Sequence, residues 1–426
     1  MFHGFVRGLK MKILLIAVGI DNKYGKGLQE ANRRRIITPI LGLPYLAACT
    51  PSDIEVKIID ETHGLMTEYE TADIVGISGM TMHANRMYKI ADKYREIGIT
   101  VVLGGIHVSF LAEEALKHAD AIMIGEGESI WPQFIEDFKN NNVKKIYRAN
   151  CFQDLSKLPR PRLDLIDGDA YRMPKGTLNS IMATRGCPNN CSFCCVKNMF
   201  GRNFRTRPIK DVVEEISDMN KDLILFADDN IIGNLNYSKK LFEAMIPLKR
   251  MWGAQASISI AEHDDILKLM AESGCVSLFI GIESVNPKNI IDINKKITND
   301  VYKYSESLKK IKDYGIKIFG SFIVGFDDDD ESVFDNIYNF IVENNIEYPL
   351  VGNLTPFPGT ELYSKLQREN RIIDYNWDRY NFTQVVFKPA KMFIEDLQFG
   401  YDNLIYHLNK YQIGVKPNNW KIEFNS

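Results

Sequence analysis

The sequence predicts an α/β protein in which two successive series of strands and helices are followed by a mainly helical C-terminal segment. Three observations support this class. Short apolar runs alternate with amphipathic stretches over residues 11–142, and they do so again, six times, over residues 178–358. A segment with several prolines and little periodicity, residues 143–177, separates the two series as a linker, and residues 359–426 break the alternation. Apolar strands joined by helical crossovers form parallel sheets that helices cover.

The first series predicts a Rossmann-like domain of the flavodoxin type. Its expected strands are short and mostly apolar, and they occupy residues 13–19, 54–60, 73–79, 100–105 and 120–125. The stretch 85–97 has apolar residues at helical spacing between two of them. Ligands of such sheets bind at the carboxyl ends of the strands, where the strand order reverses.

Small residues gather at three of these expected strand ends. Glycine there lets a backbone approach a bulky ligand closely. We therefore expect the ligand contacts of this domain at the ends of the third, fourth and fifth strands. The candidate residues are Ser78, Gly79, Met80, Gly104, Gly105, His107, Gly125, Glu126 and Gly127.

The second series predicts an open, partial barrel of six strand–helix units, a (β/α)6 version of the TIM barrel. Six units are too few for the closed barrel of eight strands, and the active sites of such barrels lie at the carboxyl ends of the strands. The expected strands occupy residues 179–186, 222–229, 253–260, 275–283, 316–326 and 348–357.

Three cysteines follow the first strand of this barrel. Cys187, Cys191 and Cys194 have the spacing C-x3-C-x2-C, and Phe193 precedes the last of them. Thiolates are soft ligands for iron–sulfur clusters or zinc, but no second Cys or His pair follows at the spacing of a zinc finger. Three thiolates can hold three irons of a cubic cluster and leave the fourth iron open to a small molecule. A structural metal knot or buried free thiols is the alternative, and we expect the adjacent Cys195 to serve in packing.

This cysteine loop resembles the signature of the radical S-adenosylmethionine (radical SAM) superfamily, C-x3-C-x-(aromatic)-C, and the match includes Phe193. The first series resembles the N-terminal cobalamin-binding domain of one large radical SAM subclass. The matching pieces are GISGMT, VVLGGIHVSF and IGEGE, in this order ahead of the cysteine loop. The resemblance implies a [4Fe–4S] cluster, SAM and cobalamin as cofactors, with cobalamin bound at the glycine-rich strand ends.

The resemblance also implies which residues bind SAM. Glu283, in GIES, matches the acid that bonds the nucleoside or amino group of SAM, and a helix-capping acid is the alternative. Asp228 stands where the family often has Gly-Gly-Glu, so a side-chain contact, a backbone contact or a simple turn all stay open. Gln255 and Ser257 alternate with apolar residues and can point into the barrel. The set is completed by residues matched to the adenine lining or placed beside the cluster, namely Gly325, Thr355 and Phe193.

One departure concerns the loop after the first strand. Many cobalamin domains carry Asp-x-His-x-x-Gly there, and that His ligates cobalt, but the loop VGIDNKYGKGLQEANRRR contains no His. Ligation by that His is therefore excluded. His107 stays a candidate cobalt ligand, beside lining the pocket or capping a helix. A scaffold domain that binds no cofactor is the further alternative.

Together these parts imply a cobalamin-dependent radical SAM enzyme, with residues 359–426 as a cap over the barrel. The leading hypothesis is a C-methyltransferase that acts on an unactivated carbon of a hydrophobic small molecule, lipid or natural-product precursor. A radical cyclase or oxidoreductase with a scaffold N-terminal domain is one alternative. A non-enzymatic iron–sulfur electron carrier or sensor is the other.

Composition restricts the partners and the location. The formal net charge of −3 over 426 residues argues against a general nucleic-acid-binding protein. The apolar run 13–20 is too short to span a membrane, and no clear signal-peptide cleavage site follows it. Scattered cysteines and a thiolate-bound cluster favour the reducing cytoplasm. We expect a flavodoxin- or ferredoxin-type protein as the reductant.

Overall fold

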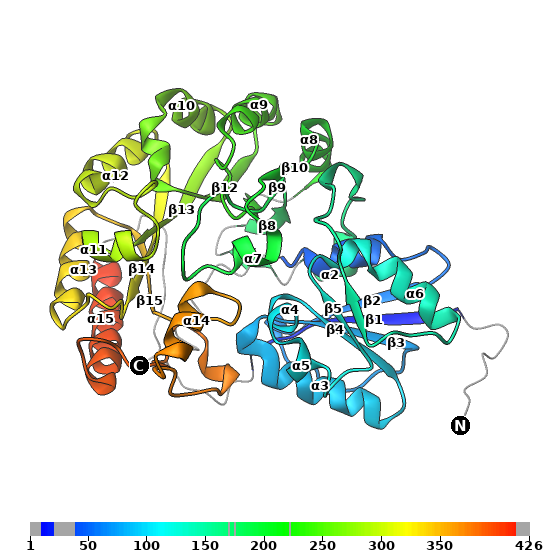
Figure 1. Cartoon of the computed structure of the whole chain (residues 1–426). Coiled ribbons are helices and arrows are strands. Elements are labelled where there is room, and N and C mark those ends of the chain that lie inside the picture. Colours follow the sequence, from blue (N-terminus) through cyan, green and yellow to red (C-terminus); the bar gives the residue numbers. More distant parts are fainter. Residues whose placement is uncertain (1–9, 21–38, 169–170, 174–175, 221–222, 415–426) are drawn as a thin grey trace. The chain divides into compact units, whose positions relative to one another are not determined.

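The computed structural model describes residues 10–20, 39–168, 171–173, 176–220 and 223–414 (Figure 1). These residues fall into two compact units, of which the first ends within residues 168–171 and the second continues to residue 414. Most of the loop after the first strand, residues 21–38, lies outside the described part. The domain limits at residues 142, 177 and 358 stay predictions.

The first unit contains a parallel sheet of six described strands in the order β2-β1-β3-β4-β5-β6. This order reverses between β1 and β3, as in the flavodoxin type that the sequence predicts. The sixth strand lies in the segment predicted as a linker. The strands are β1 (Lys12–Ala17), β2 (Glu55–Asp60), β3 (Ile74–Ser78), β4 (Thr100–Gly104), β5 (Ala121–Ile124) and β6 (Ile146–Arg148).

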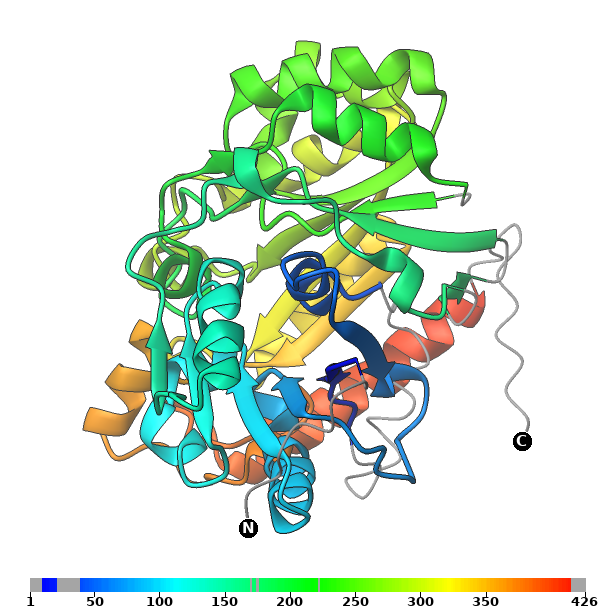
Figure 2. The same ribbon diagram turned by 90° about the vertical axis from the view of Figure 1, so that its right-hand side faces the viewer.

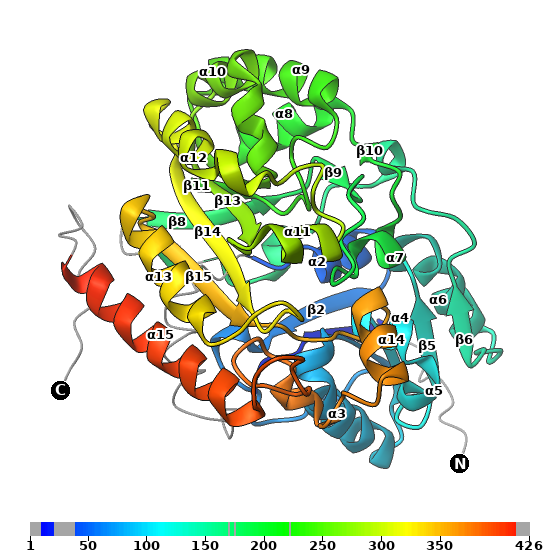
Figure 3. The same ribbon diagram turned by 60° about the vertical axis from the view of Figure 1, so that its left-hand side comes forward.

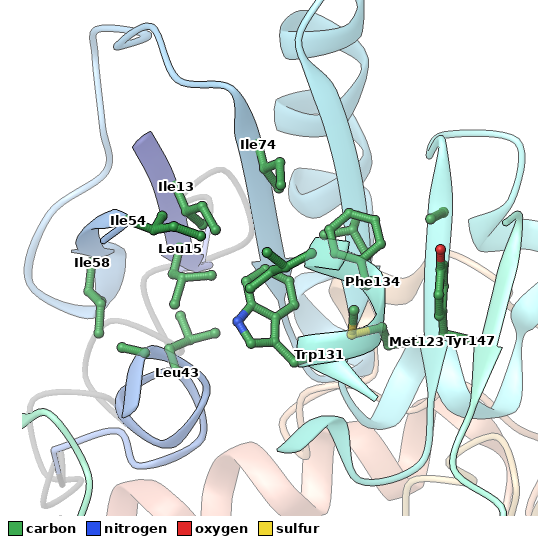
Figure 4. Packing of buried hydrophobic residues seen from close by; sticks show 14 of the residues in the cluster. Ile13, Leu15, Leu43, Ile54, Ile58, Ile74, Met123, Trp131, Phe134 and Tyr147 are labelled. Atoms are coloured by element: carbon green, nitrogen blue, oxygen red, sulfur yellow. The ribbon is translucent and has the colours of Figure 1, made fainter. Parts of the chain in front are cut away.

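Helices cover this sheet and complete its core. Ile13 and Leu15 of β1 lie in one buried cluster with Trp131 and Phe134 (Figure 4). The indole Nε1 of Trp131 donates to Thr50 Oγ1 at 2.8 Å, so this large ring is buried without an unsatisfied donor. The helices are α2 (Gly42–Ala48), α3 (Ala84–Glu96), α4 (Ile106–Phe110), α5 (Ala112–Ala115) and α6 (Trp131–Lys139).

The second unit contains six parallel strands, as predicted, in the order β15-β14-β13-β12-β11-β8, with the short β7 (Arg172–Met173) antiparallel at one edge. Since β15 and β7 are the two edges of this sheet, the described barrel is open. The parallel strands are β8 (Gly176–Ile181), β11 (Leu223–Phe226), β12 (Met251–Ala256), β13 (Cys275–Glu283), β14 (Lys317–Val324) and β15 (Tyr348–Asn353).

Helices alternate with these strands and lie along the outer face of the curved sheet (Figure 2, green and yellow). Trp252 of β12 stacks on Phe242 of α9, with ring centroids 5.0 Å apart, and so joins the sheet to its helices. The helices between strands are α8 (Ile209–Asp218), α9 (Leu235–Met245), α10 (Asp264–Glu272), α12 (Tyr304–Asp313) and α13 (Ser332–Glu343), with the short α7 (Val196–Phe200) and α11 (Pro287–Asp292) beside the strand ends.

Three predicted barrel strands are too long by four or five residues; the one predicted over 348–357 ends at Asn353, and the other two end within apolar sequence. The strand predicted over 179–186 ends at Ile181, because the N–H of Ala183 donates to Asp228 instead of continuing the ladder. The chain then turns into β9 (Thr184–Arg185), which pairs antiparallel with β10 (Arg205–Thr206). The strand predicted over 253–260 ends at Ala256 and is followed by a 3-10 helix. Apolar sequence continues through both ends, so hydrophobicity does not mark where the sheet stops.

The C-terminal segment belongs to the packing of the second unit. Helix α15 (Ile394–Gly414) lies alongside α13 and β15 (Figure 3). Phe387 and Leu397 are fully buried, and Gly400 has no room for a Cβ because the ring of Phe334 occupies that space. Helix α14 (Glu361–Arg368) precedes an irregular stretch that buries Tyr380. Among the described residues, the structure shows no helix of the length and hydropathy needed to cross a bilayer.

Candidate functional site

The cysteine loop begins at Gly186, directly after β9. Gly186 has a φ of +89°, and a Cβ there would lie 2.9 Å from Asn203 O and 3.0 Å from Gly201 O. Both the backbone conformation and the lack of space require glycine. The N–H of Gly186 donates to Asp229 at 3.3 Å. The loop therefore starts at a fixed position beside the carboxyl ends of the barrel strands.

Three other elements hold the middle of the loop. The N–H of Ser192 donates to Ile293 O at 3.1 Å, and its carbonyl accepts from the N–H of Leu362 at 3.0 Å. The side chain of Asn189 donates to Ser257 Oγ at 3.3 Å. These partners follow α11, begin α14 and follow β12. The loop is thus held by contacts from distant parts of the second unit.

The three predicted cluster cysteines lie in a largely desolvated environment. Burial raises the pKa of the Cys187 thiol to about 11 and also raises the pKa of Cys191 and Cys194. Charge on Cys191 raises the pKa of both other thiols, so the three sulfurs lie within electrostatic range of one another. Thiolates at such a site need a cation to balance them, and iron supplies that charge.

The donor set also fits a cluster better than a single ion. Among the described residues, no three His, Cys, Asp or Glu side chains are placed to bind one metal ion together. A cubic cluster does not need such convergence, because each thiolate binds a different iron. Phe193 is half-buried within the loop, and its neighbour Cys194 donates its N–H to Cys191 O at 3.2 Å. The arrangement fits the predicted [4Fe–4S] cluster.

The two aspartates after β11 support the start of the loop. Asp228 is fully buried and accepts from the N–H of Ala183 at 3.1 Å and from the hydroxyl of Thr184. Burial raises its pKa to about 7. Burial also raises the pKa of Asp229 to about 6, and the hydrogen bond from the N–H of Gly186 opposes this increase. Asp228, a predicted SAM residue, is therefore occupied by the chain itself, and we assign it a supporting role.

Gln255 and Ser257 differ in their surroundings. Gln255 is exposed, and its neighbours Ala254 and Ala256 are buried, as expected for a side chain on the inner face of the barrel. Ser257 lies beyond the end of β12 and is buried. Its Oγ accepts from Asn230 Nδ2 at 3.3 Å as well as from the cysteine loop. Gln255 thus stays a candidate SAM contact, whereas Ser257 connects strand ends to the loop.

Glu283 ends β13 at a bulge and has a φ of +65°. Its carboxylate is paired with Lys295, whose ammonium also donates to Gly281 O at 2.8 Å. Both side chains are almost completely buried. A Cβ on Gly281 would overlap the Glu283 carboxylate, so glycine at this position makes room for the pair. The predicted contact of Glu283 with SAM stays a prediction, and the carboxylate shares its charge with Lys295.

Gly325 and Thr355 follow the next two strands. Gly325 has a φ of +100°, and a Cβ there would lie 2.9 Å from Leu397 and 3.2 Å from Phe387. The packing of the C-terminal segment is therefore enough to require glycine here, and the contact of Gly325 with adenine stays a prediction. Thr355 is buried, and its hydroxyl donates to Asn353 O at 3.0 Å. Its hydroxyl hydrogen is therefore used within the chain, and its contact with SAM stays a prediction.

In the first unit, most of the predicted cobalamin residues gather at the edge of the sheet that is formed by the carboxyl ends of its strands. Ala17, Ser78 and Gly104 are partners in register at the ends of β1, β3 and β4. Gly105, with a φ of +98°, packs so tightly that a Cβ would lie 2.9 Å from both Ser78 Oγ and Gly79 O. The glycines thus allow neighbouring strand ends to meet, in addition to any approach of a ligand.

Ser109 joins this edge to the end of β5. Its hydroxyl donates to Gly105 O at 2.9 Å and accepts from the N–H of Gly125 at 3.1 Å. Ser78 and the three glycines Gly79, Gly104 and Gly125 are partly exposed, and Met80 is exposed. Gly127 lies close to Leu46, 3.0 Å from the position of an added Cβ. The edge fits a bulky ligand that is bound through peptide groups and small side chains.

His107 and Glu126 do not face this edge in the same way. His107 is fully buried, and its Nε2 lies 3.0 Å from Tyr88 OH on α3. Glu126 is buried and accepts from the N–H of Gln153. We therefore assign both a structural role. The observed edge fits cobalamin without a histidine ligand from His107.

Several residues at these sites carry no signal that sequence reasoning used. Glu61 is buried after β2 and accepts from the N–H groups of Gly19 and Met66, at 3.1 and 2.9 Å, and from Arg86. Lys295 is the buried member of a pair of adjacent lysines. In each case the partner is distant in sequence, so a motif search cannot find it.

Comparison with known proteins agrees with this geometry. The family model "Radical SAM superfamily" matches residues 181–341, and the model "B12 binding domain" matches residues 34–135. The chain is 31% identical over 393 residues to bacteriochlorophyllide d C-12(1)-methyltransferase of Chlorobaculum tepidum, covering 89% of this chain and 86% of that one. It is 27% identical over 351 residues to the hopanoid C-2 methylase of Rhodopseudomonas palustris, covering 79% and 65%.

The fold is also that of a solved relative. The structure of the cobalamin-dependent S-adenosylmethionine radical enzyme OxsB superposes with a TM-score of 0.71 at 14% identity, over 94% of this chain and 67% of that one. The two family models lie in the same order as the two units and support a cobalamin-binding enzyme over the non-enzymatic and scaffold alternatives. The chain therefore belongs to the cobalamin-binding radical SAM enzymes, with a [4Fe–4S] cluster, SAM and cobalamin as its cofactors.

Proposed function

We propose that this enzyme is a C-methyltransferase that acts on an unactivated carbon of a hydrophobic small molecule. The observation that carries the proposal is that one chain contains both a cysteine loop at the strand ends of a barrel and a second sheet with glycines at its strand ends, which is suited to cobalamin. The similar proteins from C. tepidum and R. palustris are both named as methylating enzymes, one of a bacteriochlorophyllide and one of a hopanoid. Both substrates are large and apolar, which supports the same class here.

When bound, the cluster supplies an electron to SAM, and cobalamin supplies the methyl group. The protein's own residues bind and orient. Cys187, Cys191 and Cys194 provide the three thiolates, and Asn189 and Ser192 fix their loop on the barrel.

The residues proposed for SAM lie at neighbouring strand ends. The Glu283 carboxylate, with its charge shared by Lys295, is suited to hold the ammonium of SAM. Gln255, exposed on the inner face of the barrel, is suited to a polar group of the same molecule, and Phe193, Gly325 and Thr355 complete the set through ring and backbone contacts.

The electron has to come from another protein, and we infer a flavodoxin- or ferredoxin-type donor. None of the seven cysteines, all of which lie in the described part of the chain, forms a disulfide. Thiols that stay reduced are typical of a reducing compartment, so we also infer that the enzyme works in the cytoplasm.

The test uses the full chain, reconstituted without oxygen with iron, sulfide and hydroxocobalamin, and then given dithionite, SAM and a bacteriochlorophyllide or a hopanoid. Methyl transfer of this kind consumes two SAM molecules, one to 5′-deoxyadenosine and one to S-adenosylhomocysteine. We expect both products, in equal amounts and together with a methylated substrate. Formation of 5′-deoxyadenosine with a changed but unmethylated substrate would favour a cyclase or oxidoreductase instead.

A matched pair of variants checks the cluster. C191A removes one thiolate, so we expect it to lose bound iron and sulfide and all 5′-deoxyadenosine formation. C195A changes the adjacent residue and should keep both. Equal product from wild type and C191A would contradict the radical mechanism.

A further inference from the structure

Four consecutive aspartates follow the end of β14, and two of them point to the C-terminal segment. Asp327 accepts from Arg371 at 2.6 Å and from Lys365 at 2.5 Å. Asp328 accepts from Lys391 at 2.6 Å. These pairs are partly exposed at the surface, and the cationic partners lower the pKa of both carboxyls. They connect the strand end to the cap.

The other two aspartates differ from this pair and from each other. Asp330 is exposed and accepts from the N–H of Ser332 at 3.0 Å, at the first turn of α13. Asp329 is only 2% exposed. A buried carboxylate is costly unless hydrogen bonds replace its water, so its contacts indicate why it is retained.

Asp329 accepts three hydrogen bonds, two from the chain directly after β14 and one from helix α11. Its Oδ2 accepts from the N–H groups of Gly325 and Phe326, both at 2.9 Å. Its Oδ1 accepts from Asn289 Nδ2 at 2.6 Å, and the same amide donates to Ser284 Oγ at 3.1 Å. Burial raises the pKa of Asp329 to about 6, and the three hydrogen bonds that it accepts oppose this increase by stabilising the charged form.

The network spans two of the proposed SAM contacts. Ser284 directly follows Glu283 at the end of β13, and Gly325 directly follows β14. Asn289 lies on α11, between the two strands in sequence. The carboxylate of Asp329 therefore fixes the Gly325–Phe326 peptide relative to the residue next to Glu283.

We propose that Asp329 is a positioning residue for SAM, which sets the distance between the backbone after β14 and Glu283 by accepting these three hydrogen bonds. Asp329 acts through the groups that it holds and not by contact with SAM. The inference rests on the proposed function, because it takes SAM to bind at these strand ends. The other three aspartates of the run have no such role.

Three variants separate a positioning role from a general loss of stability. D329A leaves two buried N–H donors without their acceptor. D329N keeps an oxygen for them, and its new amide can donate to Asn289 once the Asn289 amide turns over and presents Oδ1, an atom that is buried and has no hydrogen-bond partner among the described residues. D330A removes the acceptor of the Ser332 N–H at the first turn of α13 and is the control for lost stability.

The measurements are made on the reconstituted full chain with SAM as the varied substrate. We expect D329A to raise the KM for SAM about tenfold or more, with kcat for 5′-deoxyadenosine changed less than about threefold. D329N and D330A should stay within about threefold of wild type in both parameters. The change in the EPR spectrum of the reduced cluster on addition of SAM gives the same affinities without turnover.

The outcomes are separable. D329A with normal iron content and wild-type affinity for SAM would overturn the inference, and so would D329N as weak as D329A, since charge and not hydrogen bonding would then matter. If D329A does not fold, N289A breaks the same network from α11 and should raise the KM for SAM in the same way. No SAM-dependent spectral change in the wild type would instead defeat the proposed function itself.

Discussion

The ammonium of Lys295 bonds both the carboxylate of Glu283 and the carbonyl of Gly281. Lys295 follows α11 in the sequence, so it connects the segment after this helix to the bulged end of β13. Lys295 also lies close enough to Cys191 that its positive charge partly offsets the rise in pKa that burial causes in that thiol. The same segment accepts the N–H of Ser192 through Ile293. The ion pair thus connects the expected SAM residue to the cysteine loop.

Removing Lys295 should leave a buried carboxylate without its cation. We expect K295M to lower the free energy of unfolding of the apoprotein by about 3–5 kcal/mol. K296M, at the exposed neighbouring lysine, should change it by less than about 0.5 kcal/mol. Urea denaturation followed by circular dichroism measures both, and a K295M protein as stable as K296M would show that the pair is not buried in solution.

The contact between the ends of β3 and β4 predicts a specific loss of cobalamin binding. G105A places a Cβ against Ser78 and Gly79, so the two strand ends have to move apart. We expect its affinity for hydroxocobalamin to fall about tenfold or more, which corresponds to about 1.4 kcal/mol.

Gly98 provides the control, since it also has a positive φ, +81°, but open space around its Cβ position. G98A should lose about 1–2 kcal/mol of stability through backbone strain and keep its affinity for cobalamin. Titration of the apoprotein with hydroxocobalamin, read in the visible spectrum, distinguishes the two. Equal affinities of G105A and G98A would place the corrinoid elsewhere.

Asp228 predicts a pH dependence of stability. Its pKa is about 7 in the folded protein, above its ordinary value of 3.8, so the folded state holds the proton more tightly. The stability that this group contributes is complete below 3.8 and is lost as the pH rises to about 7. Compared with D228N, which cannot titrate there, the wild-type apoprotein should become progressively less stable over this interval.

The check for Asp228 is urea denaturation of both proteins at a series of pH values. The difference between their free energies of unfolding should change between pH 3.8 and about 7 and become constant above. A constant difference at all pH values would mean that Asp228 has an ordinary pKa in the folded state.

The sequence was sufficient for the elements that obey local rules. The apolar runs placed β1 to β5 of the first sheet and the six parallel strands of the second, but not β6 or β7, and the spacing of Cys187, Cys191 and Cys194 placed the loop after the first barrel strand. Strand ends were less certain, because Ala183 leaves the sheet to bond Asp228, which lies 45 residues later. A local sequence pattern cannot identify a partner so far away in the chain.

The same limit explains the individual site residues. The hydroxyl of Ser257 accepts from Asn189 and Asn230, which come from two other loops, and its contact with SAM stays a prediction. Lys295 and Lys296 are identical in type, and only the fold decides which of them is buried. The four aspartates after β14 are also identical in type, and the fold buries Asp329 among them.

The packing of α15 against α13 and β15 has a consequence for how the chain can be divided. A protein shortened to end at Pro358 would lose Phe387 and Leu397 from the space beside Gly325, and Phe334 would lose its neighbour Gly400. It would also expose the outermost strand of an unclosed sheet, whose free edge invites pairing with other molecules. Such a fragment should aggregate when it is expressed, because the barrel depends on the residues after Pro358 to cover its packing surface.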